Sequence, residues 1–254
     1  MPELITITAD VTRPVMEMIV FPIIKVLYYS DGIEIHKVVG TGLFFDSNGL
    51  FFSARHVFQG RESALDLEGA KGFAVYCVHS VHINRKMVAR HIDVTSIKTR
   101  NDTDIAAGFV EMNQIGKGDD SITEEDLRNT AHFNYATTKT VPVGTGIWTV
   151  AYPLATVNSL EDGGVNVYSK SDMFSGRITK YYPEGRDRGL LSWPCYETDM
   201  EVKSGASGDP VCISGSSGVV FAVNCTGTTP HSVSHVSSLV PLVSIVGKSG
   251  ADSN

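Results

Sequence analysis

The stretch that decides the fold is Lys203–Val211, which reads KSGASGDPV. It places Ser207 between Gly205 and Gly208, where the chain must turn sharply and expose backbone N–H groups. Glycine accepts backbone angles that a Cβ atom forbids, and Pro210 fixes the exit from the turn. A serine hydroxyl is a weak nucleophile by itself, so catalysis by Ser207 requires a general base and a carboxylate that orients it. An ordinary glycine turn is the alternative, and the rest of the chain decides between the two.

A base and a carboxylate are both present upstream. Ser53–Val57 (SARHV) contains His56, and Asp102–Ala106 (DTDIA) contains two aspartates. Histidine suits the role of base because its ordinary pKa is close to neutral pH. Asp104 is the preferred carboxylate because two apolar residues follow it and place it at the edge of the core. Asp102 competes as a residue of the turn before the strand, and a structural core histidine is the alternative for position 56.

Composition limits the kind of protein. The chain has 254 residues, enough for one large or two small domains, with 42% hydrophobic and 19% charged residues. This balance is typical of a globular fold. The formal net charge is −7 and no long run of Lys or Arg occurs, so no nucleic-acid partner is expected.

No targeting or membrane segment is predicted. Met1–Leu4 lacks the basic start of a signal peptide, which favours a cytoplasmic location. The most apolar run, residues 16–29, is interrupted by Glu17, Pro22 and Lys25 and is short for a bilayer. We therefore expect a buried strand there and no membrane association.

The four cysteines have no C-x-x-C spacing, so no metal site is expected, and the sequence indicates no cofactor. Cys212 and Cys225 flank a predicted hairpin and are candidates for neighbours. Buried thiols that act as small hydrophobic side chains are the favoured interpretation.

Short β-rich runs separated by Gly, Asn, Asp and Ser dominate from Val20 onward and favour barrels or a sandwich. The strands are predicted at 23–29, 33–39, 42–46, 50–53, 74–81, 87–97, 105–111, 141–153, 174–182, 210–214 and 219–224. Asn48-Gly49 predicts a hairpin turn, and Ser121–Glu124 has the spacing of a helix-capping box. Residues 236–246 fit either a closing strand or a terminal helix.

Taken together, these segments resemble the chymotrypsin-fold serine proteases, in particular the trypsin-like and HtrA/Deg-like peptidases. The resemblance covers roughly residues 20–241, and the order His, Asp, Ser matches the family. The segments that carry it are Gly40–Val57, Asp104–Ala106, Gly144–Pro153, Ser175–Ile178, Glu197–Asp199 and Gly205–Gly208. It implies an all-β fold of two antiparallel six-stranded β-barrels of the chymotrypsin type, with the active site in the cleft between them. The expected parts are an N-terminal extension (1–19), a first barrel (20–120), a linker with a short helix (121–140) and a second barrel (141–248).

The resemblance implies a serine endopeptidase that cuts polypeptides through an acyl-enzyme intermediate. Ser207 would be the nucleophile, His56 the base and Asp104 the orienting carboxylate. The backbone N–H groups of Gly205 and Ser207 would form the oxyanion hole. The alternative is a protease-fold binding or scaffolding module with an inactive or closed cleft, and the sequence leaves open a regulatory protein partner and a homo-oligomer.

The resemblance also implies a specificity pocket, whose candidate residues are Glu201, Asn224, Thr226 and His231. Glu201 lies six residues before Ser207, the offset at which trypsin-like enzymes carry the acid that selects basic side chains. His231 could instead line a pocket for acidic or glutamine side chains. The two interpretations predict opposite charges on the preferred residue, and the sequence does not decide between them.

The chain departs from the family pattern at three points. Asp209 stands where a glycine or serine is common, and it either faces solvent or adds a negative charge close to the nucleophile. Ala206 stands where zymogen enzymes carry an aspartate, which argues against activation of that type. No PDZ domain is expected after the closing element.

Overall fold

The computed structural model describes residues 5–10, 14–60, 63–81, 87–116, 135–159, 165–188, 191–203, 205–216, 218–228 and 233–239. Within these ranges the chain is almost entirely β, and its helical parts are α1 (Pro14–Glu17) and a 3-10 turn, η1 (Arg55–Val57). The predicted all-β architecture of two closed six-stranded barrels is confirmed. The helix predicted near residue 121 lies outside the described residues, as does the chain after residue 239.

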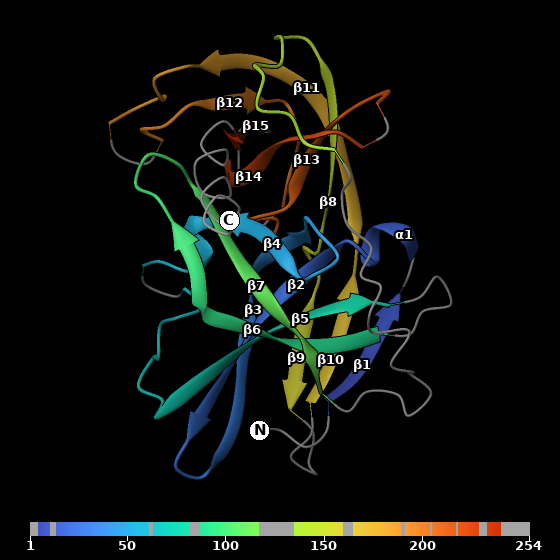
Figure 1. Ribbon diagram of the computed structural model, residues 1–254, viewed down its shortest axis with the longest axis vertical. Coiled ribbons are helices and arrows are strands. Elements are labelled where there is room, and N and C mark those ends of the chain that lie inside the picture. Colours follow the sequence, from blue (N-terminus) through green and yellow to red (C-terminus); the bar gives the residue numbers. More distant parts are fainter. Residues whose placement is uncertain are drawn as a thin grey trace, which may run out of the picture.

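The first barrel closes antiparallel in the order β2-β3-β4-β7-β6-β5 and forms the middle of the view in Figure 1. Its strands are β2 (Val20–Tyr29), β3 (Gly32–Phe44), β4 (Leu50–Ala54), β5 (Gly72–Ser80), β6 (Met87–Thr99) and β7 (Ile105–Gly116). The apolar run that looked like a buried strand is β2, whose first eight residues are buried. Its one ammonium group, on Lys25, is fully buried and donates to the carbonyl oxygens of Ser63 and Asp66 and to Glu68 Oε1.

The second barrel closes in the order β11-β12-β15-β14-β13-β8 and forms the upper part of Figure 1. Its strands are β8 (Gly146–Ala151), β11 (Asp172–Tyr182), β12 (Cys195–Thr198), β13 (Pro210–Ile213), β14 (Val220–Thr228) and β15 (Val233–Ser238). Residues 236–238 thus belong to a closing strand. All four cysteines are buried free thiols.

A third, small sheet was not predicted from the sequence. It has the order β1-β10-β9, formed by β1 (Ile5–Asp10), β9 (Thr156–Ser159) and β10 (Val165–Lys170). β1 runs parallel to β10, so the start of the chain pairs with an insertion between two strands of the second barrel. Val157 and Val167 of this sheet pack with Ile24, Val26 and other apolar residues of β2, β5 and β6. The sheet therefore covers part of the outside of the first barrel.

The two barrels share a continuous apolar core. One cluster of buried residues joins first-barrel residues such as Phe21 and Ile105 to Tyr152, Cys212 and Val223 of the second half. The Tyr152 hydroxyl also donates a 2.6 Å hydrogen bond to the carbonyl oxygen of Val20. This interface fixes the distance between the two halves of the cleft.

Candidate active site

His56 and Asp104 lie together at adjacent strand ends. β4 runs directly into η1, which carries His56, and Asp104 immediately precedes β7, the neighbour of β4. His56 Nδ1 lies 2.8 Å from Asp104 Oδ2, and the His56 backbone N–H donates to Oδ1 at 3.0 Å. The Arg55 N–H donates to the Asp104 carbonyl oxygen at 3.0 Å. Three contacts therefore fix the imidazole relative to the carboxylate.

The carboxylate is buried, whereas the imidazole reaches the surface. The side chain of Asp104 is 5% exposed and that of His56 44%. The second barrel supports this segment, because the Asp104 N–H donates to Ser237 Oγ at 3.4 Å. The competing residue, Asp102, lies at the surface and pairs with Arg100. Of the two aspartates, the structure brings Asp104 to His56.

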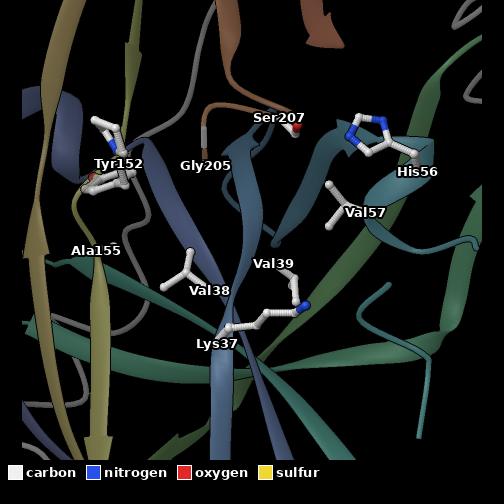
Figure 2. A pocket seen from close by; sticks show the side chains of 10 residues that line it. Lys37, Val38, Val39, His56, Val57, Tyr152, Ala155, Gly205 and Ser207 are labelled. Carbon is white, nitrogen blue, oxygen red and sulfur yellow. The ribbon is translucent and has the colours of Figure 1, made fainter. Parts of the chain in front are cut away.

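Ser207 projects from a tight loop before β13. Gly205 and Gly208 on its two sides have φ angles of +93° and +95°, in the left-handed region that favours glycine. The Ser207 hydroxyl is directed toward the His56 imidazole, although the two residues come from different barrels (Figure 2). The structure thus brings together the three residues that the sequence analysis singled out.

β3 of the first barrel is bonded directly to this loop. The Thr41 N–H donates to the Ser207 carbonyl oxygen at 2.7 Å, and Thr41 Oγ1 donates to the Gly205 carbonyl oxygen at 3.0 Å. A Cβ atom on Gly208 would lie 2.1 Å from the Thr41 carbonyl oxygen and 2.4 Å from Ser53 Oγ. Gly208 is therefore required by close packing as well as by its φ angle.

Asp209 is fully buried, so the alternative in which it faces solvent is wrong. Thr149 Oγ1 lies 2.6 Å from the Pro210 carbonyl oxygen and 2.8 Å from Asp209 Oδ2. Two separate hydrogen bonds form when Asp209 is protonated and donates to Thr149, because a carbonyl only accepts and a hydroxyl has one proton. Burial also raises the pKa of Asp209 well above its usual value. Both observations favour the neutral form of Asp209.

The candidate specificity residues are not brought together into one pocket. Glu201 is exposed, and Asn224 is 1% exposed with its amide nitrogen donating to the Ala206 carbonyl oxygen at 3.2 Å. Asn224 thus supports the loop around Ser207 from behind. The side chain of Thr226 and all of His231 lie outside the described residues.

The contact between Arg55 and the ring of Trp193 was not predicted from the sequence. The Arg55 guanidinium lies 5.2 Å from the centre of the Trp193 ring, which packs with Leu191, Cys195 and Cys225. Burial, and then the negative charge of Asp104, raise the pKa of the Cys225 thiol. A lone tryptophan in a glycine-rich loop gives no sequence signal for this contact.

A cavity of about 420 Å³ opens beside Ser207 and His56 (Figure 2). Its other lining residues are Lys37, Val38, Val39, Val57, Tyr152, Pro153, Ala155 and Gly205. Residues of both barrels form it, so it is part of the cleft between them.

The described residues offer neither a metal site nor a membrane-spanning helix. No group of three or more His, Cys, Asp or Glu side chains in these ranges could hold a metal ion. None of the helices described here is long and apolar enough to cross a membrane.

Comparison with known proteins identifies the family of this arrangement. Residues 40–223 match the model of the trypsin-like peptidase domain. The chain superposes on the crystal structure of Deg5 with a TM-score of 0.54 and 15% identity, covering 88% of this chain and 86% of Deg5. It superposes on Rv3671c from M. tuberculosis, an inactive serine-to-alanine mutant, with a TM-score of 0.52 and 15% identity, covering 96% and 94%. A comparison with curated protein sequences finds no significant match. At 15% identity the two structures show the shared fold alone.

Proposed function

The chain belongs to the trypsin-like peptidase domain family, and on this premise we propose that it is a serine endopeptidase acting through Ser207, His56 and Asp104. One observation carries the proposal. A buried carboxylate holds the His56 ring through Nδ1 and leaves Nε2 toward the cleft, where the Ser207 hydroxyl faces the imidazole (Figure 2). The substrate class is polypeptide.

In the first step the Ser207 oxygen attacks the peptide carbonyl carbon while His56 Nε2 takes the hydroxyl proton. The carbonyl π electrons move to the oxygen, and the backbone N–H groups of Gly205 and Ser207 bind that oxyanion. Loss of one such donor typically lowers turnover by roughly 10²–10³. The contacts of Thr41 with Gly205 and Ser207 therefore support catalysis by fixing the backbone that carries these donors.

The intermediate then collapses to an acyl-enzyme. The C–N bond breaks, and protonated His56 gives its proton to the leaving amine. A water molecule attacks the ester with His56 again as base, and the acid product leaves with Ser207 restored. Asp104 keeps the proton of neutral His56 on Nδ1 and stabilises the imidazolium in both halves.

The alternative of an inactive binding module rested mainly on Asp209, which could have placed a negative charge beside the nucleophile. Asp209 is buried against Thr149 and its pKa is raised by burial, which weakens this electrostatic reason for inactivity. The peptidase proposal is therefore preferred.

Labelling with a fluorophosphonate tests the proposal. We expect a covalent adduct on Ser207, located by mass spectrometry, and no adduct in the Ser207→Ala variant. Ser192→Ala is the matched control, because Ser192 is exposed and lies outside the cleft residues. A folded wild-type protein that takes no label, or a Ser207→Ala variant that is still labelled, would contradict the proposal.

A further inference from the structure

The cavity beside Ser207 has two walls that come from different barrels. Three consecutive β3 residues, Lys37–Val39, form one wall, and the segment 152–155 between β8 and β9 contributes the other. Ser207, His56 and Gly205 lie at one end (Figure 2). A bound peptide that reaches Ser207 through this cavity must run along β3.

A β-bulge shapes the first wall. Ile23 of β2 pairs with Gly40, whereas Ile24 pairs with Val38, so Val39 is an extra residue in β3. In a regular strand successive side chains point to opposite faces, but a bulge re-aims them. Val38 and Val39 can therefore both line the cavity.

The lining residues favour the leaving-group side of Ser207 for this cavity. His56, which protonates the leaving amine in the proposed mechanism, lines it together with Gly205, whose N–H is a candidate oxyanion donor. The part of the substrate that departs with the amine is thus the part that faces these walls.

We propose that this cavity selects the residues that follow the scissile bond: an apolar side chain at the first position and an acidic side chain at the second or third. This inference rests on the proposed peptidase function. Val38 and Val39, which are partly exposed, supply apolar surface, and the small side chain of Ala155 leaves room opposite β3. Burial of apolar substrate surface is favourable by about 25 cal/mol per Å².

Lys37 supplies the charge at the far end of the cavity. It lies three residues before Gly40, whose position is fixed by its packing against Val57 and the Ser207 carbonyl oxygen. Because Val39 is the extra residue of the bulge, Gly40 and Lys37 pair with Ile23 and Lys25, which are two steps apart on β2. At about 3.3 Å per residue this is about 7 Å along the sheet, the length of about two extended substrate residues. An ammonium group has three donors, so Lys37 can bind a substrate carboxylate in addition to its contacts within the protein.

Cleavage of a proteome-derived peptide library tests this, since mass spectrometry reads the residues on both sides of every cut. For the wild type we expect enrichment of apolar residues directly after the cut and of Asp and Glu at the next two positions. Lys37→Glu should lower kcat/KM for the acidic peptides about fivefold and raise it for matched basic peptides. Lys71→Glu makes the same charge change at an exposed site of the same barrel outside the cavity, and it should leave both values unchanged.

The apolar part has its own variant. Ala155→Phe should fill the space opposite β3 and shift the first position after the cut toward Gly and Ala. Cuts with no preference after the scissile bond, or a preference unchanged in both cavity variants, would overturn the inference. Fluorophosphonate labelling of Ser207 separates the two proposals: labelled protein without the preference refutes only the cavity assignment, and unlabelled folded protein refutes both.

Discussion

Each barrel buries an aspartate close to the cleft, and the two carboxyl groups have different surroundings. Counted over the whole residue, Asp104 of the first barrel is 3% exposed and Asp209 of the second is 0% exposed. Asp104 faces the His56 backbone N–H and ring nitrogen, donors that stabilise the anion. Asp209 faces one hydroxyl, Thr149 Oγ1, which also contacts the Pro210 carbonyl oxygen, and its Oδ1 has no partner among the described residues. The comparison teaches that two acids buried to the same degree can differ strongly in the number of donors around them.

Among the variants that test this difference between the two acids, we expect Asp104→Asn to have the largest effect. The amide keeps the size of the carboxyl but cannot accept from the His56 N–H and ring nitrogen as an anion does. We expect kcat to fall by about 10⁴ because the imidazole loses its orienting charge. Steady-state kinetics on a peptide substrate measures it, with Asp102→Asn as the surface control. Equal losses in both variants would show that Asp104 has no special role.

The interior of the first barrel contains a buried cation next to a histidine. Arg90 is fully buried, and its Nε donates to His79 Nε2 at 3.0 Å. His79 must therefore be neutral, with the proton on Nδ1 donated to the Ser80 carbonyl oxygen at 3.1 Å. Burial and then the charge of Arg90 lower the pKa of His79 to about 3.

This pair predicts an acid-sensitive first barrel. Because the pKa of His79 is lower in the folded state, the unfolded chain binds more protons between about pH 6.5 and pH 3. The free energy of unfolding contributed by His79 is thus present above pH 6.5 and lost as the pH falls, by roughly a few kcal/mol. The free energy of unfolding, measured by chemical denaturation at several pH values, should fall less steeply toward acid pH for His79→Gln than for the wild type. Parallel curves would show that His79 does not titrate on unfolding.

Asp209 predicts the opposite sign of pH dependence for the second barrel. Its pKa is higher in the folded state, so the folded protein binds more protons above about pH 4 and loses stability as the pH rises. The amide of an asparagine can donate to Thr149 as the protonated acid does. We expect Asp209→Asn to match the wild type near pH 4 and to become progressively more stable than it at higher pH. The same denaturation series measures this, and a variant that is less stable than the wild type at alkaline pH would show that Asp209 is ionised.

The parts of the fold that were predictable are those with a local signal. Alternating apolar runs, the Asn48-Gly49 turn and the glycines around Ser207 depend on residues close in the chain. The order His56, Asp104, Ser207 then pointed to the family, and the barrels followed from the resemblance. Asp104 was preferred over Asp102 because of its apolar neighbours, and these do hold it at the edge of the core.

The rest depends on contacts between distant segments. Pairing of β1 with β10 joins residues about 160 positions apart, and neither strand contains a signal for the other. The two alternatives for Asp209 stayed open because its burial depends on the position of Thr149 on β8, a distant strand. Asn224 turns inward beside a register shift in β14, which a count of alternating residues cannot detect.

The bonds from Thr41 to the loop around Ser207 have a consequence for how the protein acquires activity. The backbone of one half holds the Ser207 segment of the other in place, so in the proposed peptidase neither half would be a competent catalyst before they dock. A newly synthesised chain of such an enzyme would therefore cut nothing until both halves have been made and have closed on each other.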